Sequence, residues 1–151
     1  MISFYVHGIP KGQPRPKAFS RGGRAGVYDP ATAEGWKAQV AMAAKDHRPE
    51  APITGPLGLE LHFSFPRPKG HYRSGKKAHE LKPNAPWLHI SKPDFDNLEK
   101  AVADAMTQLG FWMDDSQICQ SLTTKTYTVS GKPPGCEVKL TKLSDPIQPS
   151  P

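Results

Sequence analysis

The chain has few cysteines, no Cys-x-x-Cys pair and no long apolar run. Only Cys119 and Cys136 are cysteines, which argues against a disulfide framework or a zinc site and fits a reducing cytoplasm. No stretch approaches the roughly 20 apolar residues that a membrane-spanning helix needs. The apolar run at residues 2–6 is short and alternates like a strand, so we expect neither a signal peptide nor a membrane partner.

Common nucleotide and metal motifs are missing as well. The sequence contains no GxxxxGK[ST] pattern, so a phosphate-binding P-loop is not expected. The histidines are His7, His47, His62, His71, His79 and His89. None of them shows the HxH or HExxH spacing of metal ligands, and we interpret them as surface or structural residues. We expect no organic cofactor.

The charge balance is strongly basic. The 151 residues include 20 Lys and Arg against 14 Asp and Glu, a net charge of +6, and the pI is near 9.4. Such a balance favours an acidic partner such as nucleic acid, although a basic surface without a special partner gives the same totals. Proline is abundant, with 17 residues where a usual share of roughly 5% would give about half as many.

The periodicity predicts an α+β fold: a small mixed α/β single domain with a few-stranded sheet and two main helices. The clearest strand is 57–65, where apolar and other residues alternate, and the clearest helix is 94–109, with an apolar stripe at i, i+3, i+4 and i+7 spacing. The other predicted elements are strands at 2–7, about 117–129 and 136–140, and a helix from Pro30, capped by Asp29, to about Asp46. We expect one domain over 1–143 and a disordered tail at 144–151.

Two basic segments rich in Pro and Gly separate these elements, at about 8–28 and 66–92. The first contains five Lys and Arg and the second seven, so the positive charge is concentrated in loops, which often carry function. The first segment must be a loop or a loose hairpin. The predicted DNA contacts are Lys11, Arg15, Lys17, Arg21, Arg24, Arg67, Lys69, Arg73, Lys76 and Lys77.

Two acidic motifs stand out against this charge, KPDFDN at 92–97 and MDDSQ at 113–117. A structural interpretation is sufficient for the first: Asp94 caps the helix, Asp96 complements the helix dipole and Lys100 pairs with Asp96. A chemical interpretation is that the Asp-x-Asp corner supplies two oxygen ligands to Mg²⁺ and Asp114 or Asp115 a third. A lysine one turn into the helix could then stabilise the transition state.

Geometry places a condition on the chemical interpretation. A helix of about 14 residues is roughly 20 Å long, so Asp115 starts at the far end from Asp94 and Asp96. Either the chain doubles straight back along the helix, or the second acidic pair belongs to the site of a partner chain in a dimer. The sequence leaves both open.

The acidic motifs resemble a known family. KPDFDNLEKAVADAM followed by GFWMDDSQI is similar to the RusA family of Holliday-junction resolvases, and the segment VHGIPKGQPRPKAFSRGGRAGVYDP resembles its longer members, so that the resemblance covers most of 1–141. The resemblance implies a RusA-like, intertwined homodimer that cuts four-way DNA junctions by paired symmetric incisions, with Mg²⁺ or Mn²⁺. The implied catalytic residues and metal ligands are Asp94, Asp96 and Asp115, with Lys100 as the catalytic lysine and Asp114 as a possible further ligand.

The family also implies a bacterial or phage-encoded protein of the cytoplasm. Two alternatives remain beside the junction resolvase: a nuclease that acts on other branched DNA such as flaps, and a non-catalytic basic nucleic-acid-binding protein. The segment 66–91 is longer than in compact members of the family, and it could extend the contact with DNA.

Overall fold

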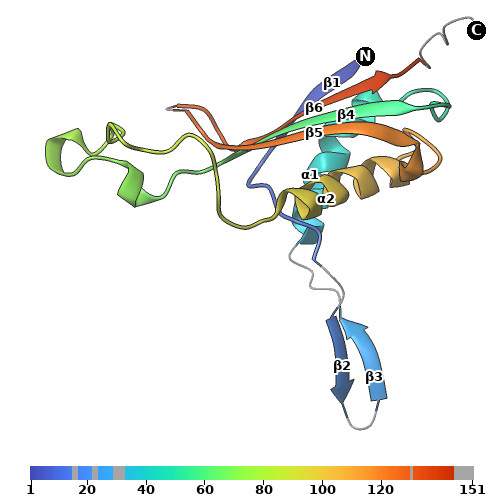
Figure 1. Ribbon diagram of the computed structural model, residues 1–151, viewed down its shortest axis with the longest axis horizontal. Coiled ribbons are helices and arrows are strands. Elements are labelled where there is room, and N and C mark those ends of the chain that lie inside the picture. The colour runs from blue at the N-terminus through green and yellow to red at the C-terminus, as the bar shows by residue number, and fades with distance from the viewer. Residues whose placement is uncertain (15–16, 22–23, 29–32, 130, 145–151) are drawn as a thin grey trace, which may run out of the picture.

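The molecule is built on one four-stranded sheet that carries two helices on the same face (Figure 1). The computed structural model describes residues 1–14, 17–21, 24–28, 33–129 and 131–144, and for the two stretches between 17 and 28 it describes the backbone alone. The strands are β1 (Ile2–His7), β2 (Lys17–Arg21), β3 (Arg24–Tyr28), β4 (Leu57–Phe65), β5 (Ile118–Tyr127) and β6 (Gly135–Lys142). The helices are α1 (Glu34–Ala44) and α2 (Phe95–Gln108), with one-turn helices η2 (Lys45–His47), η3 (Lys69–His71), η4 (Gly75–Lys77) and η5 (Asp115–Gln117).

Strand β4 is an inner strand of the sheet. Its side chains alternate between buried and half-buried positions along the whole strand, as the sequence predicts, and each fully buried Leu or Phe stabilises the fold by about 1.5–3 kcal/mol. The sheet order is β1-β6-β4-β5, with β4 antiparallel to β6 and parallel to β5. Strand β5 is therefore an edge strand of the main sheet.

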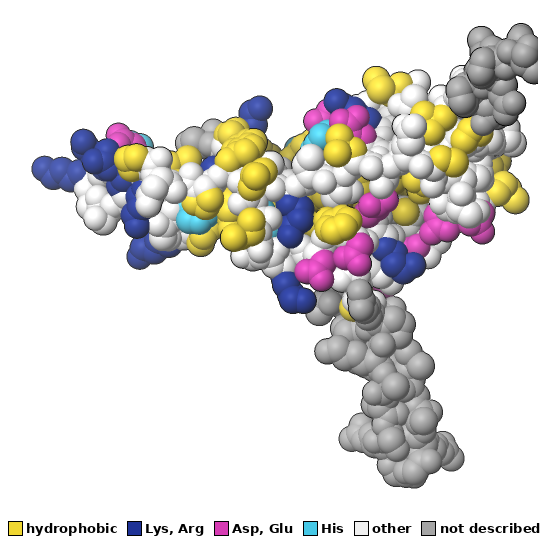
Figure 2. Space-filling view, in the orientation of Figure 1, with side chains coloured by type: hydrophobic (Ala, Val, Ile, Leu, Met, Phe, Trp, Pro, Cys, Tyr) yellow, Lys and Arg dark blue, Asp and Glu magenta, His cyan; other side chains and the backbone are white. Residues whose placement is uncertain are grey.

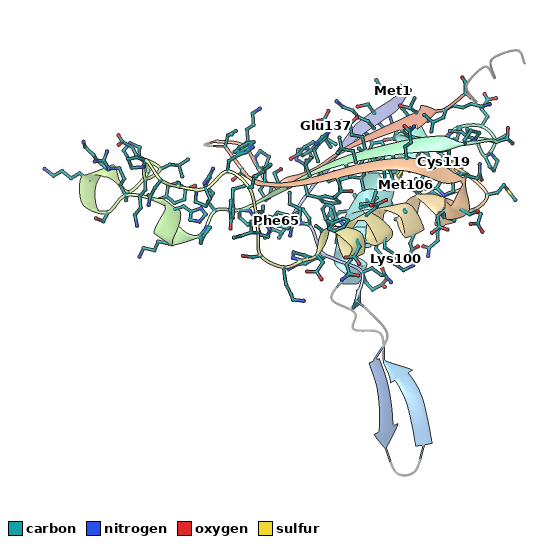
Figure 3. All side chains as sticks on the ribbon, viewed as in Figure 1. Met1, Phe65, Lys100, Met106, Cys119 and Glu137 are labelled. Atoms are coloured by element: carbon teal, nitrogen blue, oxygen red, sulfur yellow. The ribbon has the colours of Figure 1, made fainter. Side chains whose placement is uncertain are left out.

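Helix α2 packs its apolar stripe against the sheet. Leu98, Val102 and Met106 are fully buried, and Met106 lies between the helix and the sheet in Figure 3. Gly110, the residue after the C-cap Leu109, has φ +84°. Its N–H donates to the Thr107 carbonyl oxygen at 3.0 Å, and the Phe111 N–H donates to the Met106 carbonyl oxygen at 3.2 Å. This pair of hydrogen bonds is the Schellman ending that a glycine after a helix favours, and it turns the chain back toward the sheet.

Helix α1 buries Trp36, Val40 and Ala44, as predicted. Its described part begins at Glu34 with Ala33 as N-cap, and the predicted cap Asp29 and first-turn Pro30 lie outside the described residues. The first basic segment contains a hairpin in which β2 pairs antiparallel with β3, in agreement with the expected loose hairpin.

Some predictions fall outside the described part of the chain. Arg15 lies there entirely, the side chains of Lys17, Arg21 and Arg24 are not described, and neither are residues 145–151 of the predicted tail. Among the described helices, none combines the length and apolar character needed to cross a membrane. The single chain does not test the predicted homodimer, which stays a prediction.

Candidate active site

A groove lies between helix α2 and the first half of strand β5, with a volume of about 380 Å³. We call it the α2–β5 groove. Its lining residues are Asp96, Glu99, Lys100, Ala103, Asp115, Ile118, Cys119, Gln120 and Ser121. Three of the predicted site residues, Asp96, Lys100 and Asp115, therefore line one surface of the molecule.

The helical wheel explains the α2 side of the groove. Side chains three and four residues apart share a helix face, so Asp96, Glu99 and Lys100 point the same way. The buried stripe of α2 lies elsewhere on the helix, and in Figure 3 Lys100 is on the side away from the sheet. The Lys100 side chain is 60% exposed, and its Nζ lies 3.9 Å from Asp104 Oδ1. An exposed ammonium group at this place remains accessible to an anionic ligand.

After α2 the chain doubles back along the helix, which is one of the two arrangements that the sequence left open for Asp115. After Gly110 and η5, strand β5 runs beside the helix in the opposite direction: the Thr123 hydroxyl donates to Glu99 Oε2 at 3.4 Å. Asp115 thus lines the same groove as Asp96. Within the described residues, however, no group of three or more His, Cys, Asp and Glu side chains is close enough to hold a metal ion. The carboxylates of one chain are spread along the groove.

The two aspartates of the MDDSQ turn occupy different environments. Asp114 is the N-cap of η5, and its Oδ1 accepts a 2.8 Å hydrogen bond from the Ser116 N–H. That backbone hydrogen bond lowers the pKa of the exposed Asp114 carboxyl. Asp115, one residue further on, lines the groove instead. Of the two, Asp115 therefore lines the groove with Asp96, while Asp114 caps the turn.

Gln117 holds this turn in place with both ends of its amide. The side-chain oxygen accepts from the N–H groups of Met113 at 2.9 Å and Asp114 at 3.2 Å, and Nε2 donates to the carbonyl oxygens of Ile53 at 2.9 Å and Gly55 at 3.0 Å. One side chain thus ties the turn to the segment before β4. We assigned Gln117 no role from sequence, although Asp-x-x-Gln is a capping-box spacing that could have revealed it.

Asp94 lies apart from the groove. It occupies the N-cap position of α2, as the structural interpretation expects, but its side chain makes no capping hydrogen bond. Its Oδ2 lies 3.9 Å from Lys92 Nζ. Asp94 lines a second pocket with Gly12, Gln13 and Asn97, where the Gln13 N–H donates to the Asn97 carbonyl oxygen at 2.8 Å. The segment that precedes the β2–β3 hairpin is therefore anchored at the N-terminus of α2, beside Asp94.

Two charged residues near the site were not singled out by the sequence. Glu99 adds a carboxylate to the groove, and its place three residues after Asp96 could have indicated this. Lys125 lies on β5 close enough to Asp94 to feel its charge; burial lowers the pKa of Lys125, and the negative charge of Asp94 opposes that shift. No local pattern marks Lys125, because only the pairing of β5 with β4 places it near α2.

Comparison with known proteins identifies the family of the chain. The profile of the family described as endodeoxyribonuclease RusA matches residues 7–141, which places the chain among endodeoxyribonucleases. The chain belongs to the RusA family, as its motifs indicate.

Individual relatives differ in how much of the chain they cover. An uncharacterized protein, YqaN, of Bacillus subtilis (strain 168) is 36% identical over 143 residues, which are 95% of this chain and 97% of YqaN. The crossover junction endodeoxyribonuclease RusA of Escherichia coli (strain K12) is 45% identical over 38 residues, 25% of this chain and 32% of that protein. RusA of Escherichia coli O139:H28 is 42% identical over 53 residues, 34% of this chain and 42% of that protein.

Proposed function

We propose that this protein is a divalent-metal-dependent endodeoxyribonuclease that resolves four-way DNA junctions by paired symmetric incisions. The observation that carries the proposal is the α2–β5 groove, which brings Asp96, Asp115 and Lys100 of the family motifs onto one surface. The names of the RusA relatives, crossover junction endodeoxyribonucleases, support the same substrate.

The donor chemistry of the site fits Mg²⁺, with Mn²⁺ as a substitute. Asp96 and Asp115 in the groove, with Asp94 outside it at the N-terminus of α2, offer carboxylate oxygens, the ligands that this hard cation prefers. Mg²⁺ usually takes only one or two carboxylates beside water and phosphate. When bound, such a cation supplies neutralising charge for the phosphate and a water of lowered pKa. In the hydrolysis, a water oxygen bonds to phosphorus while the P–O bond to the departing deoxyribose oxygen breaks. Lys100 would donate a hydrogen bond to a phosphate oxygen that gains negative charge in this step.

A homodimer fits the proposed paired incisions. A two-fold axis gives two equal sites, one for each of two strands. Whether each site takes Asp96 and Asp115 from one chain or from both is decided by mixing two inactive variants, Asp96→Asn and Asp115→Asn, under conditions in which subunits exchange. If both residues come from one chain, every site in the mixture carries a substitution and the mixture is inactive. If each site is shared, a mixed dimer contains one intact site and recovers nicking of a single strand.

The deciding experiment uses a four-way junction with fixed arms and labelled strands, incubated with the protein with and without Mg²⁺. A linear duplex and a flap of equal length serve as comparison substrates. We expect symmetric nicks in opposing strands, on the junction alone and with metal alone. Cleavage of the flap in preference to the junction would identify a nuclease for other branched DNA. Binding without cleavage under Mg²⁺ and Mn²⁺ would leave a basic DNA-binding protein whose aspartates have structural roles.

A further inference from the structure

Residues 66–91 form an ordered arm that leaves the end of β4 and returns beside β5. Figure 1 shows this arm, in green and yellow-green, extending beyond the sheet on the side opposite to the N-terminus. We call residues 66–91 the arm. Two of its five predicted DNA contacts, Arg67 and Arg73, have partners within the protein. The presence or absence of such partners separates the residues that build the arm from those that could bind a ligand.

Arg67 anchors the base of the arm, the part next to β4 and β5, which we call the arm root. Its Nε donates to the Thr128 carbonyl oxygen at 2.9 Å and its Nη1 to the Pro86 carbonyl oxygen at 2.7 Å. The guanidinium also lies over the Tyr127 ring, 5.4 Å from its centroid. One side chain thus joins the outgoing and returning parts of the arm to the end of β5, a use for which the fork of an arginine is suited.

The returning part of the arm pairs with the outer edge of β5. The Tyr127 N–H donates to the Trp87 carbonyl oxygen at 2.9 Å, and the His89 N–H to the Lys125 carbonyl oxygen at 3.0 Å. The His89 ring stacks on Phe65 with ring centroids 4.0 Å apart. The root of the arm is therefore an extension of the sheet.

The outer part of the arm is held by its own hydrogen bonds. The Arg73 N–H donates to the Glu80 carbonyl oxygen and the Lys82 N–H to the His71 carbonyl oxygen, both at 2.8 Å. Arg73 Nη1 and Glu80 Oε2 form an ion pair at 3.2 Å. Glu80 is the only acidic residue of the arm, and its negative charge is paired with Arg73. No other acidic side chain of the arm can neutralise its lysines.

Four lysines remain on the arm without a compensating acid: Lys69, Lys76, Lys77 and Lys82. All four are exposed, and among the described residues none of them forms an ion pair. In Figure 2 the dark-blue side chains gather along the arm, while magenta acidic side chains lie along the body near α2. A fixed array of like charges on an ordered support produces a positive potential that attracts a polyanion.

We propose that the arm binds the phosphate backbone of a DNA duplex segment away from the α2–β5 groove, through Lys69, Lys76, Lys77 and Lys82. The inference rests on the proposed function, since it takes branched DNA as the substrate. Backbone phosphates are the ligand that fits this surface, because lysines act as positive point charges. The helices of the arm, η3 and η4, have one turn each, so neither is long enough to read a major groove. The arm contributes affinity, and the groove contributes the chemistry.

The test compares two double variants that remove the same charge. Lys76→Gln with Lys77→Gln alters the arm, and Lys45→Gln with Lys142→Gln alters exposed lysines elsewhere on the molecule. Binding to a long-armed junction is measured without metal at several salt concentrations. We expect the arm variant to reduce the slope of log affinity against log salt by about 2, since each phosphate contact contributes about 0.9. The control variant should change the slope little.

Junctions with shortened arms test the position of the contact. If the arm holds duplex away from the branch point, the difference between wild type and the arm variant disappears when the DNA arms are too short to reach it. Equal effects of the two double variants, or no effect of either, would overturn the proposal. So would an arm effect seen on an RNA duplex and absent on DNA.

The cleavage assay keeps this proposal separate from the proposed function. The arm variant should need more DNA for half-maximal cleavage of the junction, with a much smaller change in the rate at saturating DNA, because the groove is intact. A wild-type protein that cuts nothing refutes the proposed nuclease and leaves the salt-slope comparison as a valid test of the arm. A junction that is cut normally, with no difference in slope between the double variants, refutes the arm alone.

Arg67→Lys tests the division between anchor and contact. This variant keeps the positive charge and removes the fork that joins Thr128 and Pro86. We expect faster cleavage of the arm by a protease and weaker DNA binding at unchanged net charge. An Arg67→Lys protein with wild-type protease resistance in the arm would show that Arg67 is not the anchor.

Discussion

The α2–β5 groove and the arm carry opposite charges and use them differently. In the groove, the carboxylates of Asp96, Glu99 and Asp115 line a common surface with Lys100, which concentrates negative charge there. On the arm, the acid and the two arginines are used internally, and lysines are left outside. A site rich in carboxylates repels phosphate, so in the proposed nuclease we expect most of the positive charge that contacts DNA to lie outside the groove.

Asp96→Asn is expected to have the largest effect of the substitutions considered, on the chemistry of the groove rather than on DNA binding. Loss of a metal-ligating carboxylate removes several kcal/mol of transition-state stabilisation, so junction cleavage should fall by about 10³-fold or more. DNA binding should persist or tighten, since a negative charge is removed. Single-turnover cleavage and binding are measured on the same junction, with Asp46→Asn, at an exposed position of η2, as the control. Near wild-type cleavage by Asp96→Asn would contradict the assignment of this residue.

Lys100→Ala should have the next largest effect. Removing a donor aimed at developing charge typically costs about 10²–10³-fold in rate, and the loss should appear in the rate at saturating DNA. Lys100→Arg, which keeps a positive charge, should recover part of the rate. If Lys100→Ala cuts as fast as wild type, the lysine only neutralises Asp104, its neighbour at 3.9 Å.

Gln117→Met tests whether the turn positions Asp115. The residue touches no proposed reacting atom, and changes to supporting residues of a metal site typically cost about 10–100-fold in affinity or activity. We expect the variant to need more Mg²⁺ for half-maximal cleavage, a readout that lost stability alone would not move. Gln108→Met, at the exposed end of α2, makes the same chemical change and should leave the Mg²⁺ dependence unaltered.

His89→Phe should have the smallest effect, on the arm root alone. Burial, with a smaller contribution from the charge of Lys125, lowers the pKa of His89 below its ordinary 6.5. The folded state then binds the proton less well than the unfolded state, so the stability contributed by His89 is present above pH 6.5 and is lost as the pH falls through the lowered pKa. The variant should reduce the drop in Tm between pH 7.5 and pH 5 by about 2 °C. His79→Phe, at a site 78% exposed, should not.

Much of the fold could be predicted because its signals are local. The alternation of β4 and the stripe of α2 are periods of two and 3.6 residues, and burying one face of each element is enough to specify them. The helical period also placed Asp96 and Lys100 off the buried stripe of α2, whereas the preference for Asp115 over Asp114 came from the resemblance to the RusA family.

The particular use of each charged side chain depended on distant partners. Arg67 and Lys76 look alike in the sequence, yet one is held by Thr128 and Pro86 and the other is exposed. Asp114 and Asp115 are neighbours, and the turn uses the first for capping. Sequence alone could not separate Arg67 from Lys76, because hydrogen bonds across tens of residues decide the use of Arg67. The cap made by Asp114 is local, and the Asp-x-x-Gln spacing could have revealed it.

The sequence by itself therefore determined the type and approximate extent of the main elements and the basic character of the two loop segments, and it supplied candidate residues for metal and phosphate chemistry. The tertiary structure decided the sheet order β1-β6-β4-β5, and with it the return of β5 along α2 that puts Asp115 on the same groove as Asp96. The physical reason is that periodicity reports which face of an element is buried, whereas strand pairing joins residues far apart in the chain, and only that pairing determines which exposed faces meet.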